Sequence, residues 1–124
     1  MIAAIGIDII EVSRIRKLLE KGERFKKRIY TNLEQEYCDG KKNAALSYAA
    51  RFAAKEAFLK ALGTGLSGGV SFKEIALVND EKGKPELNLH GKARAMVLKK
   101  GGSSWHVSLS HLEDLAAAVV ILEK

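Results

Sequence analysis

The amino-acid sequence predicts an α+β fold in which helices from the first half of the chain pack on a mostly antiparallel sheet. Two observations lead to this class. Helix-forming residues with a helical spacing of apolar side chains fill residues 12–62, and β-rich segments fill much of residues 74–122. Helices followed by strands, rather than a regular alternation of the two, are typical of α+β folds. Neither an internal repeat nor a linker is visible, so residues 1–124 are expected to form one domain.

The first half is expected to contain one strand and four helices, at residues 2–10, 12–21, 24–28, 31–38 and 43–62. The strand, IAAIGIDII, is β-branched and apolar on both faces, which is typical of a buried strand, and it is too short to span a membrane. Gly22 is the expected end of the first helix. Thr31 and Glu34 form a capping-box pattern at the start of the third helix, and Gly63 ends the long fourth one.

The second half is expected to contain four strands, at residues 74–78, 86–90, 105–110 and 115–122, and a basic helix at about 92–100. The turn NDEKGKP, residues 79–85, joins the first two of these strands. Before them lies the glycine-rich segment 63–69, whose GTG sequence follows a helix rather than opening one. It therefore lacks the helix N-terminus that makes such loops bind phosphate, and we interpret it as a helix cap and chain reversal.

The single cysteine and the absence of a long apolar run indicate the cellular context. Cys38 has no second thiol with which to form an internal disulfide, which favours a reducing cytoplasm. No segment has the length of a transmembrane helix. No basic region precedes the apolar run at the N-terminus, which disfavours a signal peptide.

The positive charge of the chain is concentrated in one window. The formal net charge is +6, and residues 14–28 hold many basic side chains against only Glu20 and Glu23. The basic residues are Arg14, Arg16, Lys17, Lys21, Arg24, Lys26, Lys27 and Arg28. Such a patch indicates an anionic partner, and a solvated helix face is the simpler alternative. Phe25 is the only aromatic residue among them, so no base-stacking surface for nucleic acid is indicated; an acidic protein or a phosphorylated small molecule fits as well.

A glutamate falls within the apolar face of the long helix. At roughly 100° per residue, Glu56 lies among alanine and phenylalanine side chains, whereas Arg51 and Lys55 are expected on the polar side. A carboxylate in that position is costly unless it has a partner. Lys60, one turn later on the same face, offers an ordinary i,i+4 ion pair. That pair alone does not explain why both residues face the core.

A second carboxylate lies in a similarly apolar setting. Asp8 is the only charged residue in the first strand, and the alternative to a functional role is that it caps the following helix. Two carboxylates on separate apolar elements can hold a hard metal ion, share a proton or pair with Lys or Arg. Because neither has a His or Cys close to it in the sequence, zinc is disfavoured, and oxygen ligands would select magnesium or manganese.

Histidine and serine residues provide further candidates near the C-terminus. His111 ends a strand just before a loop, where functional side chains often gather. We interpret His90 as a surface residue and His106 as a structural one. A nucleophilic pair built from Ser108 or Ser110 with His111 is disfavoured, because a catalytic serine seldom has its base next to it in the chain.

Three motifs together resemble those of the holo-acyl-carrier-protein synthases, the small bacterial 4′-phosphopantetheinyl transferases. They are Gly6-Ile7-Asp8-Ile9 with Arg14-Ile15, then Arg51-Phe52-Ala53-Ala54-Lys55-Glu56-Ala57 continuing through Lys60 to Gly63-Thr64-Gly65, and Val107-Ser108-Leu109-Ser110-His111. Length, order and spacing agree from end to end, and the middle motif is specific. One departure is Leu112, since this position usually holds a small polar or acidic residue in the family.

The resemblance implies a reaction and a set of catalytic residues. In the family, the phosphopantetheine arm of coenzyme A is transferred to a serine of apo-acyl carrier protein, in support of fatty acid biosynthesis, and adenosine 3′,5′-bisphosphate is released. By this resemblance Asp8 and Glu56 bind Mg²⁺, which bridges to the pyrophosphate and neutralises the charge that develops there. Lys60 is expected to contact the same phosphates. A metal-bound water and Glu56 are both candidates for the base that takes the serine proton.

The resemblance also implies binding residues for both substrates. Arg51 and His111 match positions near the 3′-phosphate of coenzyme A, and Lys84 with Pro85 lies in the turn that approaches adenine. Acyl carrier proteins are acidic helical bundles, so the basic window is expected to bind them. The expected contacts to the carrier are Arg14, Arg24 and Arg28. Small members of the family are trimers with sites between subunits, and a homotrimer is therefore expected here.

Two other functions are compatible with parts of the sequence. A non-enzymatic module would bind an acidic protein or nucleic acid through residues 14–28 and would release no nucleotide product. A different magnesium-dependent phosphotransferase would act on nucleoside triphosphates, but the chain has no P-loop to favour it.

Overall fold

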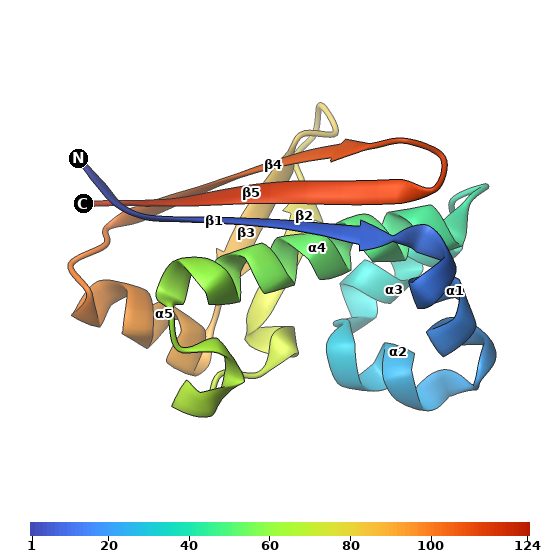
Figure 1. Ribbon diagram of the computed structural model, residues 1–124, viewed down its shortest axis with the longest axis horizontal. Coiled ribbons are helices and arrows are strands. Elements are labelled where there is room, and N and C mark those ends of the chain that lie inside the picture. The colour runs from blue at the N-terminus through green and yellow to red at the C-terminus, as the bar shows by residue number, and fades with distance from the viewer.

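A long helix, α4 (Ala44–Leu62), lies along one face of a three-stranded antiparallel sheet in this computed structural model, which describes residues 1–124. The strand order is β1-β5-β4, formed by β1 (Ile2–Glu11), β5 (Leu115–Glu123) and β4 (Ser104–His111). Figure 1 shows the sheet along α4 and both chain ends at the same end of the sheet. The strands at the two ends of the chain are therefore direct neighbours, paired for example at Ile7 and Val119.

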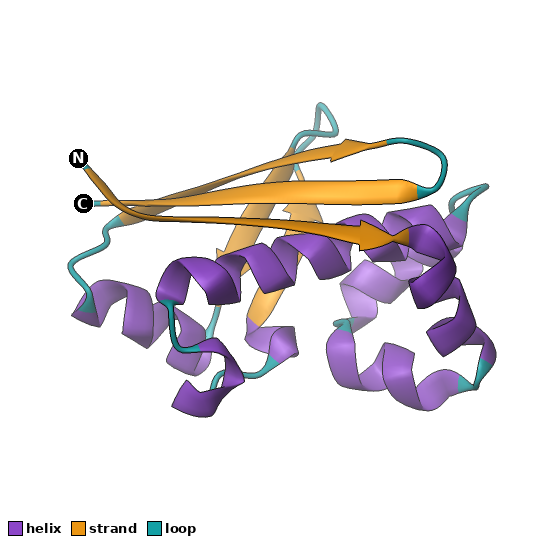
Figure 2. Cartoon of the chain, viewed as in Figure 1, coloured by secondary structure: helices purple, strands orange, loops and turns teal.

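Shorter elements surround α4 (Figure 2). The helices α1 (Val12–Glu20), α2 (Glu23–Ile29) and α3 (Asn32–Asp39) gather at one end. After α4 come the 3₁₀ turns Gly65–Gly68 and Phe72–Glu74, the antiparallel pair β2 (Ile75–Asn79) and β3 (Pro85–Leu89), and α5 (Gly91–Lys99). These elements confirm the α+β class. The strands form two sheets rather than one, and the indole of Trp105 in β4 links them by donating to the carbonyl of Leu87 in β3 at 3.1 Å.

The interpretation of α4 as a helix with one polar side is wrong. Arg51 and Lys55 are buried, with relative exposures of 3% and 0%, whereas Glu56 is only partly buried. The three-stranded sheet covers one side of α4, and α3 and β2 contact the other. Because α4 is covered on opposite sides, the side on which Arg51 and Lys55 lie is buried rather than solvated. No helix of the chain, α4 included, has both the length and the apolar character needed to cross a membrane.

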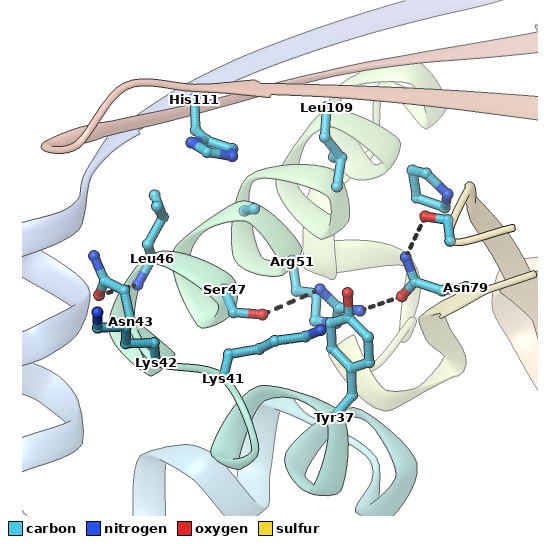
Figure 3. A pocket seen from close by; sticks show the side chains of 13 residues that line it. Tyr37, Lys41, Lys42, Asn43, Leu46, Ser47, Arg51, Asn79, Leu109 and His111 are labelled. Carbon is cyan, nitrogen blue, oxygen red and sulfur yellow. Dashed lines mark hydrogen bonds between the residues drawn. The ribbon is translucent and has the colours of Figure 1, made fainter.

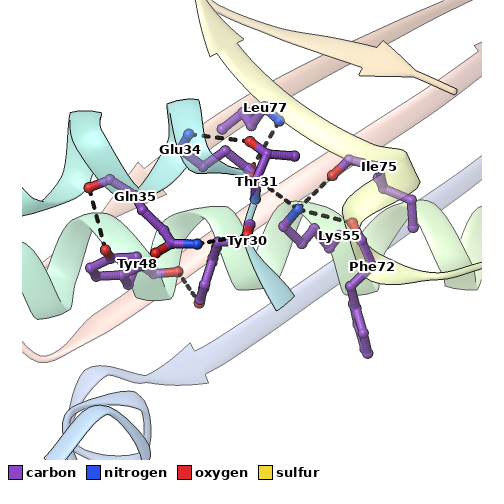
Figure 4. Close-up of polar contacts among 9 residues, drawn as sticks. All are labelled: Tyr30, Thr31, Glu34, Gln35, Tyr48, Lys55, Phe72, Ile75 and Leu77. Atoms are coloured by element: carbon purple, nitrogen blue, oxygen red, sulfur yellow. Dashed lines mark hydrogen bonds and ion pairs between the residues drawn. The ribbon is translucent and has the colours of Figure 1, made fainter. Parts of the chain in front are cut away.

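Lys55 is held in a buried ion pair that the sequence analysis did not predict (Figure 4). Its ammonium donates to Glu34 Oε1 at 2.9 Å and to the carbonyls of Phe72 and Ile75 at 3.0 and 2.8 Å. Burial lowers the pKa of Lys55, and the charge of Glu34 opposes that shift. Glu34 also closes the predicted capping box at Thr31 and accepts from the backbone N–H of Leu77. The pair therefore joins α3, α4 and β2 in one network.

The expectation that the first strand is buried on both faces is also wrong. The residues of β1 that point away from α4 are exposed, with Ile5, Ile7 and Ile9 at 62%, 67% and 64%. Only the other face of the sheet is covered by α4 within one chain. An apolar row of this kind on a sheet is typical of a surface that another protein covers.

Candidate active site in two parts

Gly6 sets the distance between β1 and α4 and so places Asp8 over the helix. A Cβ atom at Gly6 would lie 2.0 Å from the carbonyl oxygen of Ala57 and 2.7 Å from the backbone nitrogen of Ala61. Real Cβ atoms essentially never come that close to backbone atoms, so only glycine permits this approach. Asp8, two residues later on the same face of the strand, is thereby brought to the side of α4 that carries Glu56 and Lys60.

Asp8 and Lys60 are joined directly. Lys60 Nζ lies 2.9 Å from Asp8 Oδ1 and 3.1 Å from the carbonyl oxygen of Ile7. The side chain of Asp8 is 14% exposed, whereas that of Lys60 is 56% exposed. The N-cap of α1 is Glu11 rather than Asp8, so the alternative of a helix-capping aspartate is wrong. Lys60 pairs with Asp8 and makes no ion pair with Glu56, so the i,i+4 pair is absent as well.

The charge of Asp8 affects the pKa of Glu56. Burial raises the pKa of Glu56, and the nearby carboxylate of Asp8 raises it further, while Lys60 and Arg14 act in the opposite direction. The two carboxylates are therefore close enough to repel each other, and a cation between them would relieve that repulsion. A hollow of about 450 Å³ opens beside Glu56 and Lys60 and is bordered by Gly63 and Gly65. Gly63 itself has the left-handed conformation of a helix cap, with φ of 80°, as predicted.

A larger pocket of about 520 Å³ lies at the start of α4 and contains Arg51 and His111 (Figure 3). Arg51 Nη2 donates to Asn79 Oδ1 at 2.6 Å, and Nη1 donates to Ser47 Oγ at 3.5 Å. The guanidinium carbon lies 4.1 Å from the centre of the Tyr37 ring. The Nε atom is buried and has no hydrogen-bond partner. Arg51 is thus fixed from several sides and retains an uncommitted donor.

The β2–β3 turn and α3 complete this pocket. Gly83 and Pro85 line it from the turn, together with Lys41 and Lys42 from the loop before α4. Lys84 lies in the same turn and is exposed, but its side chain is not part of the lining. His111 is exposed at the end of β4 and also borders a small hollow with Ile9, on the uncovered face of the sheet.

The two parts of the site do not meet within one chain. The hollow beside Glu56 and the pocket of Arg51 share no lining residue. Arg51 and Glu56 are five residues apart on α4, which places them about 140° apart around the helix axis. Of the predicted residues, the structure therefore brings together Asp8, Glu56 and Lys60 in one group. It brings together Arg51, Pro85 and His111 in another.

The basic window forms a third feature, an apolar groove with basic edges. A hollow of about 460 Å³ is lined by Leu18, Lys21, Gly22, Arg24, Phe25, Arg28, Ile29, Phe52 and Phe72. Arg24 and Arg28 are exposed at this groove. Arg14 is exposed on α1 outside the groove, and its charge lowers the pKa of Glu56, which places it toward the carboxylates. The cationic patch thus extends from the groove toward the acidic group.

Sequence reasoning missed several residues of the Arg51 pocket. Tyr37, Ser47 and Asn79 hold Arg51, but each belongs to a different element and none carries a charge. An aromatic residue and an asparagine next to a turn are ordinary in any sequence, so only their contact with Arg51 identifies them. Ser108 and Ser110 make no side-chain hydrogen bond with His111.

Comparisons with known proteins identify the family. The model of the 4′-phosphopantetheinyl transferase superfamily matches residues 4–120. A holo-[acyl-carrier-protein] synthase of Geotalea daltonii is 48% identical over 125 residues, covering 100% of both chains. The crystal structure of a synthase of the same name from Neisseria meningitidis superposes with a TM-score of 0.91 at 40% identity over 100% of both chains.

A third comparison concerns a ligand-bound structure. The holo-(acyl-carrier-protein) synthase of Bacillus anthracis, solved in complex with CoA (3′,5′-ADP), is 42% identical. It covers 99% of this chain and 97% of its own length, with a TM-score of 0.82. These relatives carry the same name and match the chain over 99–100% of its length, and the two solved structures share the fold described above. The chain therefore belongs to the 4′-phosphopantetheinyl transferase superfamily, in its holo-[acyl-carrier-protein] synthase family.

Proposed function

We propose that this chain transfers the 4′-phosphopantetheine arm of coenzyme A to a serine of apo-acyl carrier protein and releases adenosine 3′,5′-bisphosphate. The full-length similarity to holo-[acyl-carrier-protein] synthases is the observation that carries this function. The product carrier serves fatty acid biosynthesis. The cytoplasm is the proposed location, because coenzyme A is a cytoplasmic substrate and the one cysteine of the chain is unpaired.

The acidic group fits a magnesium ion. Asp8 and Glu56 supply only oxygen donors, and their mutual repulsion favours a divalent cation between them. No cluster of three or more His, Cys, Asp or Glu side chains occurs, so most coordination positions would be left to water and to substrate phosphate, as Mg²⁺ prefers. When bound, the ion would stabilise negative charge on the pyrophosphate as its bond breaks. Lys60, which is more than half exposed, would contact the same phosphates.

The two parts of the site support a shared site in a homotrimer. One ligand that contacts both the acidic group and the Arg51 pocket needs residues from opposite sides of α4. A second chain placed on the uncovered row Ile5, Ile7 and Ile9 would lie next to His111, which borders the hollow at Ile9. We propose that the Arg51 pocket of one subunit holds the nucleotide of coenzyme A and that the neighbour supplies Asp8, Glu56 and Lys60.

The groove between α1 and α2 is the proposed docking site for the carrier. An acidic helical partner would place an apolar side chain against Phe25, Phe52 and Phe72 and its carboxylates against Arg24 and Arg28. Arg14 would direct the partner toward the carboxylate group, because its charge acts on Glu56 and it lies on α1 outside the groove. A module that only binds acidic proteins would use the same surface but would release no nucleotide.

One assay tests the function and the assignment of its parts. The protein, apo-acyl carrier protein, coenzyme A and magnesium are incubated, and the carrier mass and the released adenosine 3′,5′-bisphosphate are measured. We expect the carrier mass to rise by one phosphopantetheine group per nucleotide released. Asp8→Asn and Glu56→Gln should each lower the metal affinity or the activity by at least about 10–100-fold. An effect of this size follows even the loss of a residue that only supports a metal ligand.

The same assay separates the carrier surface from the nucleotide site. Arg24→Glu should raise KM for the carrier and leave KM for coenzyme A unchanged, because reversing a charge at the edge of a docking surface mainly slows encounter. Binding of the carrier without release of nucleotide would favour the non-enzymatic module. Equal effects of Arg24→Glu on both substrates would remove this groove from the carrier interface.

A further inference from the structure

We propose that Asn79 is the positioning residue that holds the guanidinium of Arg51 in place for the 3′-phosphate of coenzyme A and couples it to the β2–β3 turn. This inference rests on the proposed function, because it assigns a ligand group to the Arg51 pocket. In the sequence, Asn79 is the first residue of the predicted turn 79–85, and nothing near it along the chain distinguishes it. Its contacts in the folded structure distinguish it.

The carboxamide of Asn79 is fully used between two parts of the pocket. Its Oδ1 accepts from Arg51 Nη2 at 2.6 Å, and its Nδ2 donates to the carbonyl oxygen of Gly83 at 2.9 Å. The guanidinium has only donors, so the oxygen of the amide must face Arg51 and the nitrogen must face the turn. Asn79 therefore bridges a buried cation on α4 and a pocket-lining residue of the turn.

The turn does not need Asn79 in order to form. Asp80 Oδ1 accepts from the backbone N–H groups of Lys82 and Lys84, at 2.9 and 2.8 Å. Two backbone hydrogen bonds, Asp80 N to Lys84 O and Gly83 N to Asp80 O, each 2.9 Å long, close the same turn. Because these hydrogen bonds already stabilise the turn, we assign the Asn79 side chain a different role, which is to hold Arg51 through their short hydrogen bond.

A neutral acceptor at this position preserves the positive charge of Arg51. Arg51 is 3% exposed as a residue, and its guanidinium has no carboxylate partner; its contacts are Asn79, Ser47 and the Tyr37 ring. A buried cation that is held by neutral groups retains an uncompensated charge for a ligand. Its Nε is buried and has no hydrogen-bond partner within the chain. A phosphate monoester, with its charge and several acceptor oxygens, is the ligand group that fits such a fork of donors.

The experiment compares Asn79→Asp with Asn79→Ala. Aspartate keeps an acceptor for Arg51 but neutralises its charge and loses the donor to Gly83. Alanine keeps the charge but leaves Arg51 Nη2 without its acceptor. We therefore expect both variants to raise the KM for coenzyme A roughly tenfold or more, the size of effect produced by loss of a charge-assisted hydrogen bond. In Asn79→Ala the KM rises because Arg51 is no longer held, and in Asn79→Asp it rises because the charge of Arg51 is neutralised. Asn79→Asp should be the more stable of the two in thermal unfolding, because it keeps an acceptor for Arg51. If Asn79 only maintained the fold, KM would follow stability, and the KM of Asn79→Asp would stay close to that of the wild type.

Two further measurements make the assignment specific. With 3′-dephospho-coenzyme A, the KM of Asn79→Asp should equal that of the wild type, because the group that Arg51 contacts is missing. The kcat at saturating coenzyme A should be retained, since the carboxylates belong to the other part of the site. Asn88→Asp, which adds the same charge at an exposed position of β3, is the matched control and should change neither KM nor the preference between the two nucleotides.

Defined outcomes would overturn the proposal. An unchanged KM for coenzyme A in Asn79→Asp, or an equal increase for both nucleotides, shows that Asn79 does not position Arg51 for the 3′-phosphate. The wild-type protein is assayed before any variant. If it releases no adenosine 3′,5′-bisphosphate, the proposed function itself is wrong.

Discussion

Glu56 and Glu34 illustrate how a carboxylate with an uncompensated charge differs from one that the fold satisfies. Glu34 is fully buried, but its two oxygens accept from Lys55, Thr31 and Leu77, so its charge is compensated within the fold. Glu56 is only partly buried, yet its pKa is raised, first by burial and then by Asp8. The fold therefore satisfies the first carboxylate and leaves the second in need of a cation, which is typical of a ligand-binding group.

This difference predicts how pH and magnesium affect stability. A raised pKa means that folded Glu56 holds its proton at pH values where the unfolded chain has lost it, so its ionised form destabilises the metal-free fold above that range. With a chelator present, Glu56→Gln should be more stable than wild type at neutral pH. The gain should vanish as the pH falls below the ordinary pKa of glutamate. Thermal unfolding against pH measures it, with Glu36→Gln on the exposed side of α3 as the control.

Magnesium provides the second half of this comparison. Added magnesium should raise the melting temperature of the wild type and leave that of Glu56→Gln almost unchanged, because a ligand stabilises only the form that binds it. A variant that is less stable than wild type at neutral pH in chelator would contradict the raised pKa. A variant that magnesium stabilises as strongly as wild type would remove Glu56 from the metal site.

For single residues, the sequence identified charged side chains that lie in apolar segments. It did not identify residues whose role depends on a contact with a distant part of the chain. Asp8 and Glu56 stood out because each lies in an apolar segment, and the structure places both at one site. Lys55 looked like a solvated lysine. Its partner Glu34 lies 21 residues away, and no local pattern reports a contact at that separation. Asn79 was missed for the same reason, since its acceptor role depends on a contact with Arg51 across 28 residues.

At the scale of elements, the pairing of β1 with α4 explains the position of the acidic group. Most strands and helices lie where composition and turn residues predicted them, including the exact capping box at Thr31 and the cap at Gly63. What the sequence did not reveal is that α4 is covered on opposite sides, because helical periodicity alone assumes one buried face. It also did not reveal that Gly6 is required by close approach to Ala57 rather than by a turn.

Gly6→Ala tests this packing directly. The added Cβ would meet backbone atoms of α4, which cannot move as a flexible side chain does, so β1 must shift away from the helix. We expect a loss of about 1–3 kcal/mol in the free energy of unfolding, the usual cost of overpacking a core. The requirement for magnesium should also rise, because Asp8 moves away from Glu56. Urea unfolding and the magnesium dependence of turnover are the measurements.

The control for this variant is Gly40→Ala. Gly40 has a φ of −80°, and a Cβ there would make only ordinary contact, 3.5 Å from the carbonyl oxygen of Glu36. This exchange should change stability little and leave the magnesium requirement at the wild-type value. If Gly6→Ala behaves in the same way as Gly40→Ala, close approach of β1 to α4 does not position Asp8.

At the scale of the whole molecule, the separation of the two parts of the site is the feature that remains to be explained. The acidic group and the Arg51 pocket lie on opposite sides of α4, and in the proposed function one extended ligand contacts both. The uncovered row of Ile5, Ile7 and Ile9 provides a surface through which a neighbour could bring the missing part. Chain length and the family resemblance predicted a shared site. The exposed row Ile5, Ile7 and Ile9 was not predicted, because the first strand was expected to be buried on both faces.

Subunit mixing decides between a shared site and a site within one chain. Asp8→Ala lacks an acidic ligand, His111→Ala lacks a pocket residue, and each is expected to be nearly inactive alone. When they are unfolded and refolded together in equal amounts, a cyclic trimer places an intact acidic group opposite an intact pocket at about a quarter of all interfaces. Activity should therefore recover toward about one quarter of the wild-type value.

If each site lay within one chain, every site in the mixture would still lack one group, and proven mixed trimers would show no recovery. Such a result would exclude the shared site while leaving the assignment of Asp8 and Glu56 intact, because their proximity is a property of the single chain.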